Sequence, residues 1–587
     1  MRRTDVFCTI LCAAVVLAAF LLVNPFVELP FNDDWSYAFT VQKLLQTGHI
    51  IYNGWGSPAI ITQAYWGAAW AKIFGFSFTT LRFSTLPLAM GSAVVCFLLG
   101  RLSGLRPAPA VFAALMLGLS PIFLPLATSF MTDISGLFFM LLSIYALANA
   151  TLARRIAWLA VGVAAAIVGG MTRQVVFIVP LIVIPYLLWI GRKDRRFCAA
   201  GVAGWVLVLI GFIATQSWFS RQPDVVTYPS LMTSLHWAIQ TPRANLDRGG
   251  RFILTLSLLT LPVSVCLVFL ILDACRRRVR LLLFCALVGI ALALDIHSNP
   301  DLLHWPWSPN VVWPDGILIN CELSGQPPAA MPAWFVTLWS VLVFIALGAS
   351  LALLADFSTR GRNLANTARR ILAPRNGDSA PIILAIVGTA YLALLLTRTM
   401  IFDRYALPMI PIVAIFTLLY VQRYSGGLRV RRVAFTAGAI VLAFYTAFSL
   451  AATRDLMALA RARVAAIHAL RDAGVAPTAF AAGLEYDCWT QLQLQGHVNY
   501  RFASNHSHPV NPNVGLTPAL WCRYRVEYNP TPQTHRSHFA PIRYTSWLPP
   551  FHRAIYIDQF LDPWWLTHPP PDGKAPVPNG VDFEMLY

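Results

Sequence analysis

The chain has 587 residues, of which 57% are hydrophobic and only 12% are charged. One soluble core could not bury so much apolar surface, so the composition predicts a protein with many membrane spans and excludes an ordinary soluble protein. The net charge of +18 does not indicate nucleic-acid binding, because the arginines lie in short clusters between apolar segments, where they orient membrane helices.

About thirteen apolar segments are long enough to cross a bilayer as helices. They cover residues 6–23, 86–102, 108–125, 134–150, 156–170, 175–190, 199–215, 252–272, 281–294, 334–355, 382–396, 406–419 and 433–452. Alternate loops carry basic clusters, and every cluster falls on the same side. The positive-inside rule therefore places the N-terminus in the cytosol, and it places the loop after the first span and the C-terminus outside.

The first outer loop contains two adjacent carboxylates, Asp33 and Asp34. Like charges side by side tend to raise one pKa, which suits a general base near neutral pH. Alternatively, Asn32 or Asp33 caps the amphipathic helix that we expect to begin at Trp35. Both roles are compatible, because one acid can cap the helix while its neighbour does chemistry.

Two amphipathic segments follow, at residues 35–46 and 59–76. We expect both to lie at the membrane surface, because aromatic residues gather in and between them. These residues are Trp35, Tyr37, Tyr52, Trp55, Tyr65, Trp66 and Trp70. They form either a surface that handles lipid or an aromatic belt of the kind that many membrane proteins carry.

Three outer junctions further along the chain carry polar residues at helix ends. These residues are Asp133, Arg173, Gln174, Arg398 and Arg404. The positive-inside rule disfavours arginine on this side, so the arginines need an anion, and a phosphate group held in bidentate contacts would supply it. The alternative is internal ion pairs, of Arg173 with Asp133 and of Arg404 or Arg398 with Asp403.

The tail, residues 453–587, has few long apolar segments and many Pro, His, Tyr and Arg residues. It predicts a small α+β domain outside the membrane, with a first helix at 454–472 and a strand and a helix within 475–495. An oxidising compartment would permit a disulfide between Cys488 and Cys522, although spacing alone does not establish the pair.

We predict no metal site. The sequence has no CxxC or His/Cys zinc motif, and the histidines and acids of the outer loop 296–332 are irregularly spaced. The tail histidines follow no ligand spacing either; they are His497, His506, His508, His535 and His538.

Together these motifs resemble the membrane glycosyltransferases of the C-type fold (GT-C), specifically glycosyltransferase family 39 and its bacterial relatives. That group includes the protein O-mannosyltransferases and the aminoarabinose transferase that modifies lipid A. The likeness covers most of the chain to residue 452 and rests on four segments, residues 32–35, 129–133, 172–174 and 403–408.

The resemblance implies an all-α polytopic membrane domain over residues 1–452, with interfacial helices within 33–76, and an extramembrane α+β domain over 453–587. It implies transfer of a sugar, with inversion, from a polyprenyl phosphate to a lipid, glycan or protein acceptor at the outer face. Some relatives use a divalent metal and others do not; because this sequence lacks an unambiguous ligand set, we predict no cofactor.

In this mechanism a carboxylate takes the proton of the acceptor, and cations stabilise the phosphate that leaves. We expect Asp34 to be the base, with Asp33 next, and Asp133 to position a substrate or share this work. Arg173 and Arg404 are the expected phosphate ligands. Further substrate contacts are expected from Arg398, Gln174, Trp35, Tyr37 and Trp55.

Two other classes share some of these features. A transporter or flippase of lipid-linked sugars would also have many spans, but it predicts inverted repeats and charge near the membrane midplane, which we do not find. An O-antigen ligase or polymerase is the alternative enzyme. High Arg, Ala and Pro usage with little Lys is typical of a GC-rich bacterial genome, which favours undecaprenyl phosphate as carrier and the bacterial inner membrane as location, with the site and the tail in the periplasm.

Overall fold

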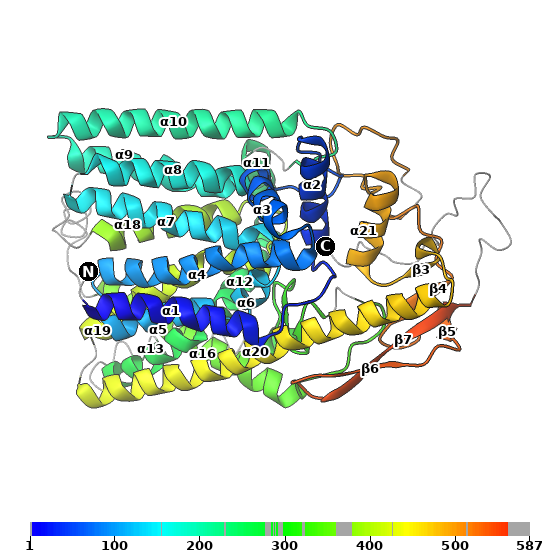
Figure 1. The fold of residues 1–587 in the computed structure, drawn as a ribbon. Helices are drawn as coiled ribbons and strands as arrows, with labels where there is room; N and C mark the ends of the chain where they lie inside the picture. Colours follow the sequence, from blue (N-terminus) through cyan, green and yellow to red (C-terminus); the bar gives the residue numbers. More distant parts are fainter. Residues whose placement is uncertain are drawn as a thin grey trace.

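The computed structural model describes residues 3–561, except 154, 228–230, 276–282, 284, 286, 288, 291–296, 320–322, 360–378, 425–426 and 512–514. In Figure 1 the long helices run side by side. Helices α2 (Asp34–Thr47) and α3 (Ile61–Phe74) lie at one end of this bundle, with α2 across the helix ends, and the C-terminal sheet lies beyond them. The N-terminus is at the opposite end of the bundle.

Seven helical segments in the described part of the chain are long and apolar enough to cross a membrane. They lie within α1 (Arg3–Leu22), α4 (Phe78–Leu102), α7 (Thr132–Ala153), α9 (Ile178–Gly191) with the preceding 3-10 turn η1 (Gln174–Phe177), α10 (Arg195–Ser220), α16 (Ala333–Thr359) and α20 (Leu428–Asp472). Four shorter apolar helices accompany them, α5 (Pro107–Gly118), α8 (Ile156–Thr172), α18 (Ser379–Leu395) and α19 (Met409–Tyr424). The predicted multi-span helical architecture is confirmed, and the predicted span 281–294 lies mostly outside the described residues.

The predicted span 252–272 is not one straight helix. Helices α12 (Pro242–Leu259) and α13 (Leu261–Cys275) meet at an angle of 88°. Pro262 follows the break, and because proline has no N–H and disfavours helical geometry at the residue before it, the first helix cannot continue. Helix α12 therefore contains residues 252–259 of the predicted span together with residues 242–251 before it.

The predicted boundary between residues 452 and 453 falls inside a single helix. Helix α20 has 45 residues and includes both the last predicted span and the predicted tail helix 454–472. No proline interrupts it, and its alanine-rich second half favours continuation. At about 1.5 Å per residue, α20 is roughly twice as long as a bilayer core is thick, so it leaves the bundle and reaches the C-terminal sheet.

The C-terminal part is an α+β unit, as predicted. Strand order in its sheet is β3-β4-β7-β5, and β6 also pairs with β7. The elements are η4 (Pro477–Ala479), β3 (Phe480–Ala481), α21 (Leu484–Gln495), β4 (Tyr524–Glu527), β5 (Thr534–Arg536), β6 (Ile542–Thr545) and β7 (His552–Phe560). The predicted strand and helix within 475–495 correspond to β3 and α21.

Several short elements connect the longer helices. These are α6 (Phe123–Ala127), α11 (Leu231–Gln240), η2 (Pro300–Leu303), the hairpin of β1 (Val312–Trp313) and β2 (Gly316–Ile317), and η3 (Asp403–Ala406).

The disulfide that the sequence permitted is not formed. Cys488 and Cys522 are both buried free thiols. Cys488, on α21, packs in an apolar cluster with Trp35 and Phe39 of α2, where it acts as a small apolar side chain.

The predicted aromatic surface is divided between interior and exterior. Trp35 and Tyr37 are buried, so they do not face lipid head groups, whereas Tyr65 and Trp66 on α3 are exposed. The reason is tertiary: α21 packs against Trp35, and Tyr37 packs in the main hydrophobic core, so both side chains that the local pattern placed at an interface become core residues.

Candidate active site

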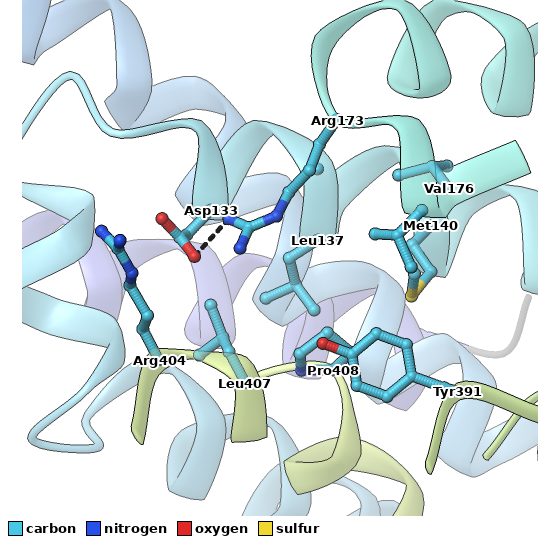
Figure 2. Close-up of a pocket in the computed structure, with 11 residues that line it drawn as sticks. Asp133, Leu137, Met140, Arg173, Val176, Tyr391, Arg404, Leu407 and Pro408 are labelled. Atoms are coloured by element: carbon cyan, nitrogen blue, oxygen red, sulfur yellow. Dashed lines mark hydrogen bonds and ion pairs between the residues drawn. The ribbon is translucent and has the colours of Figure 1, made fainter. Parts of the chain in front are cut away.

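Two ion pairs between distant parts of the chain form the centre of the candidate site. The Arg173 guanidinium, after α8, pairs with Asp133 at the start of α7, and the Nη1 atom of Arg404 in η3 lies 3.1 Å from the Oδ2 atom of Asp33. Figure 2 shows the Asp133 carboxylate between the side chains of Arg173 and Arg404. The four side chains are largely buried, so these pairs are shielded from solvent.

Of the predicted ion pairs of Arg173 and Arg404, one is confirmed and one is wrong. Arg173 does pair with Asp133, but Arg404 pairs with Asp33 rather than with Asp403. The Asp403 carboxylate instead accepts hydrogen bonds from the backbone N–H groups of Val311 (2.9 Å), Val312 (2.8 Å) and Arg404 (2.6 Å). Burial raises the pKa of Asp403 to about 6 against the opposing effect of these donors. Asp403 thus fastens η3 to the β1–β2 hairpin.

A small cavity lies at these pairs. Its charged lining consists of Asp133, Arg173 and Arg404, and Tyr391 with several apolar side chains completes the wall (Figure 2). Its volume of about 10 Å³ is room for about one water molecule. A sugar does not fit, so substrate entry requires the site to widen.

Two atoms at this cavity are buried without a hydrogen-bond partner among the described residues. They are the Oδ2 atom of Asp133, an acceptor, and the Nε atom of Arg404, a donor. Buried polar atoms in folded proteins are nearly always paired, so an unpaired acceptor and an unpaired donor at one cavity are suited to a polar ligand.

A larger groove, with a volume of about 630 Å³, lies beside the C-terminal end of α8. Met171 lines this groove together with Ile61, Tyr65 and Trp218. Two residues further on, Arg173 lines the small cavity. The last turn of α8 and the residue that follows it therefore line neighbouring spaces.

Asp34, the expected base, does not line the cavity. It is 2% exposed. Its Oδ1 atom accepts a hydrogen bond from the backbone N–H of Phe31 (2.5 Å), and its Oδ2 atom accepts one from Phe130 (3.2 Å). Burial raises the pKa of Asp34 to about 7, although Arg82 and these two donors lower it. Asp34 closes the turn of the acidic loop and ties it to the junction before α7.

Asp33 occupies the capping position of α2, but its side chain makes no capping hydrogen bond. Its two oxygens contact other groups: Oδ2 pairs with Arg404, and Oδ1 accepts a hydrogen bond of 2.8 Å from the Nε1 atom of Trp55. Of the two capping alternatives, a cap by the side chain of Asp33 is therefore wrong, and Trp55 positions Asp33 rather than facing lipid.

Arg82 is a supporting residue that the sequence analysis missed. It lies near the start of α4, is 1% exposed, and donates to the carbonyl oxygens of Pro25 (2.7 Å), Val27 (2.9 Å) and Leu29 (2.9 Å). Its guanidinium lies 4.7 Å from the centre of the Phe31 ring. Arg82 thus holds the segment that delivers the acidic pair. Its position just before a span on the outer side, where arginine is disfavoured, was an available signal.

The C-terminal unit supports the same loop. The backbone N–H of Asn32 donates to the Oε1 atom of Glu485 on α21 (3.3 Å), and Glu485 pairs with Arg463 of α20 at 2.9 Å. Both members of this pair are almost fully buried. No local pattern marks Glu485, because its importance arises from a contact across 453 residues of sequence.

The remaining expected site residues lie outside the cavity. Gln174 donates from Nε2 to the carbonyl oxygen of Ser57 at 3.5 Å. Arg398, in the turn after α18, is partly exposed and does not line the cavity.

Part of the chain matches a known protein family. Residues 61–218 match the sequence model of the dolichyl-phosphate-mannose-protein mannosyltransferase family. This segment contains Asp133 and Arg173 but neither the acidic pair nor Arg404. The match confirms the resemblance to GT-C membrane glycosyltransferases of the family-39 type. No curated protein sequence matches the chain.

Several solved structures are similar to this one. ArnT from Cupriavidus metallidurans bound to undecaprenyl phosphate has a TM-score of 0.40 and 14% identity, over 79% of this chain and 72% of ArnT. The oligosaccharyltransferase AglB from Archaeoglobus fulgidus, in complex with an inhibitory peptide and a dolichol-phosphate, has a TM-score of 0.42 and 15% identity, over 78% of this chain and 56% of AglB. The Pmt1-Pmt2 O-mannosyltransferase complex of S. cerevisiae, bound to the sugar donor, has a TM-score of 0.29 and 12% identity, over 36% of this chain and 32% of that chain.

Proposed function

We propose that this GT-C membrane glycosyltransferase transfers a sugar, with inversion, from a polyprenyl phosphate to a hydroxyl or phosphate group of a lipid, glycan or protein acceptor. The observation that carries this proposal is the pair of partly buried arginines, Arg173 and Arg404, held by carboxylates at a small cavity. The family match over residues 61–218 supports the class of reaction.

The arginines suit the phosphate that leaves. In a buried site, fixed guanidinium groups stabilise developing negative charge more strongly than water does, and they can bind phosphate in bidentate contacts. Each arginine pairs with a carboxylate while the cavity is closed. Binding of the donor phosphate would replace those contacts and release the carboxylates.

Released carboxylates would then serve the acceptor. We assign the general base to Asp133, because its Oδ2 atom is buried at the cavity without a hydrogen-bond partner among the described residues. The acceptor O–H gives its proton to Asp133 while its oxygen bonds to the anomeric carbon, and the carbon–oxygen bond to phosphate breaks with its electron pair on the phosphate. Asp33 is the second candidate base, and Asp34 is a positioning residue.

We infer the orientation of the chain in the membrane from the distribution of its basic residues. Basic residues lie between α9 and α10 and at the start of α20, at the end of the bundle that also carries the N-terminus. The candidate site and the C-terminal unit are at the other end. By the positive-inside rule, the site faces outward, which in a bacterium is the periplasmic face of the inner membrane.

The test is transfer of labelled sugar from a panel of polyprenyl phosphate donors by the purified chain in lipid. We expect Asp133→Asn to lose at least about a hundredfold in turnover, with a donor KM no higher than that of wild type because Arg173 is freed from its carboxylate. Arg251→Ala, which removes an exposed ion pair with Asp247, is the control.

If Asp133→Asn keeps full turnover while Asp33→Asn loses it, the general base is Asp33 and not Asp133. If no donor is turned over but lipid-linked sugar crosses the bilayer, the chain is a transporter and the proposal is wrong.

A further inference from the structure

Two loops from different parts of the chain meet beside α2 and are joined by backbone hydrogen bonds. The loop after α10 and the loop 504–508 form an isolated bridge between Val225 and Ser504. The Ser504 N–H donates to the Val225 carbonyl (2.6 Å), and the Asp224 N–H donates to the Asn505 carbonyl (3.3 Å). Their relative position is therefore fixed by the backbone and does not depend on the side chains that they carry.

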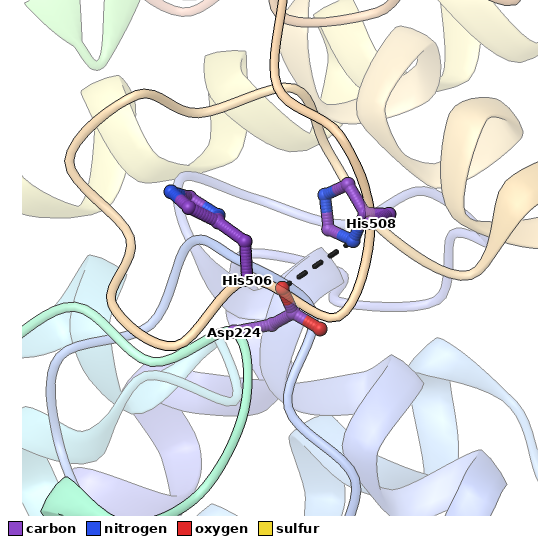
Figure 3. A group of neighbouring side chains, drawn as sticks. All are labelled: Asp224, His506 and His508. Atoms are coloured by element: carbon purple, nitrogen blue, oxygen red, sulfur yellow. Dashed lines mark ion pairs between the residues drawn. The ribbon is translucent and has the colours of Figure 1, made fainter.

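This junction brings together one acid and two histidines. Asp224 lies on the first loop, and His506 and His508 lie on the second (Figure 3). One ligand atom from each residue lies within 4.8 Å of the others. Ligands around a tetrahedral zinc ion are roughly 3.4 Å apart, given bond lengths of about 2.0–2.2 Å. Side-chain rotation can close that difference, because His506 is exposed and free of tight packing.

We propose that Asp224, His506 and His508 bind one divalent transition-metal ion, such as Zn²⁺, with water in the fourth position. Two imidazoles and one carboxylate are a donor set that zinc and its neighbours prefer. The sequence analysis rejected a site here because the histidine spacing was irregular. The third ligand, Asp224, lies 282 residues before His506 in the sequence, in a loop that contains no recognisable motif.

The ring of His508 stacks on that of His497, with ring centres 3.1 Å apart, but the nitrogen atoms of His508 make no short hydrogen bond among the described residues. Its Nδ1 atom lies 3.4 Å from the Oδ1 atom of Asp224 and 3.3 Å from the Ser507 hydroxyl, both long contacts. Its Nε2 atom is buried without a hydrogen-bond partner among the described residues. Asp224 itself is buried, and its carboxylate is oriented by the Ser507 N–H (3.2 Å) and hydroxyl, as second contacts commonly orient a metal ligand.

The position of the ion gives it a structural role. It would join the loop after α10 to the C-terminal unit. The Asp224 carbonyl also accepts a hydrogen bond from the Gly54 N–H (2.8 Å), and the next residue, Trp55, donates to Asp33. Metal binding would therefore stiffen the turn that positions one acid of the candidate site.

The test measures metal directly and does not depend on sugar transfer. The full chain is purified without a polyhistidine tag, stripped with a chelator and titrated with Zn²⁺. Bound zinc is then counted by elemental analysis, and thermal unfolding is followed with and without the ion. We expect one zinc per chain and a higher unfolding temperature in its presence.

His506→Ala is the decisive variant, because an exposed side chain can be removed without loss of the fold. We expect its zinc affinity to fall at least about tenfold, as in His508→Ala, while the exposed His538→Ala control binds as wild type does. No stoichiometric zinc in wild type overturns the proposal. Unchanged affinity in His506→Ala also overturns it and leaves only a pair between His508 and Asp224.

Discussion

The Nη1 atom of Arg404 lies 3.1 Å from the Oδ2 atom of Asp33, although 371 positions separate these residues in the sequence. The contact joins the acidic loop before α2 to the short helix η3 before α19. It makes the two halves of the membrane part interdependent at the candidate site.

Replacing Arg404 with alanine should therefore abolish most transfer. The variant removes one of two cations available to the leaving phosphate and leaves Asp33 without its cationic partner. We expect turnover to fall at least about a hundredfold, with only partial recovery in Arg404→Lys, because lysine cannot make bidentate contacts. Steady-state transfer assays check this, with Arg251→Ala as control. Activity within a few-fold of wild type in Arg404→Ala would rule out a phosphate contact.

Asp34 should give the stability of the protein a distinct pH dependence. Burial raises its pKa to about 7, whereas an aspartate in an unfolded chain titrates near 4. Between about pH 4 and pH 7 the folded chain therefore holds a proton that the unfolded chain has released. This residue thus lowers the free energy of unfolding as pH rises through that window.

The measurement is the unfolding temperature of wild type and Asp34→Asn in detergent at several pH values from 4.5 to 8. The variant keeps only one of the two acceptor oxygens at every pH, but its unfolding temperature should fall less between low and high pH than that of wild type. Asp403 and Asp487, whose pKa values burial also raises, are common to both proteins. Parallel curves would contradict a raised pKa at Asp34.

Arg82→Leu should loosen the segment before the acidic pair. It leaves three carbonyl oxygens without their donor, at a cost on the order of 1–3 kcal/mol for each that stays buried. We expect a lower unfolding temperature and weak transfer. Arg82→Lys should recover part of both, because one ammonium group cannot reach all three carbonyls. If Arg82→Leu unfolds at the wild-type temperature, the segment is held by other contacts.

Glu485 tests whether the C-terminal unit supports the site. Glu485→Ala removes the carboxylate that pairs with the buried Arg463, and breaking such a pair typically costs about 3–5 kcal/mol. Glu485→Gln keeps an acceptor for the Asn32 N–H and should retain more transfer than Glu485→Ala at equal amounts of folded protein. The double variant Arg463→Met with Glu485→Leu should recover stability but not transfer. If Glu485→Ala, Glu485→Gln and the double variant transfer sugar equally well, the C-terminal unit does not support the reaction.

Local properties of the sequence determined much of this architecture. Apolar segment length defined most spans, and charge on the disfavoured side of the membrane identified Arg173 and Arg404. The adjacent acids marked the first outer loop, and the strand and helix of residues 475–495 followed from their local pattern. These features are readable because span length and arginine placement depend on the bilayer, which acts on each segment separately.

Contacts between distant segments decided the rest. The turn at residues 31–34 directs Asp33 toward Arg404 and Asp34 toward the backbone of Phe130, although the two acids are adjacent. Helix α20 continues through the predicted domain boundary because nothing in its sequence stops it, and α21 then buries Trp35 and Cys488 against each other. Which carboxylate reaches a cavity, which aromatic side chain is core and which histidine meets Asp224 depend on packing geometry, which neither periodicity nor spacing encodes.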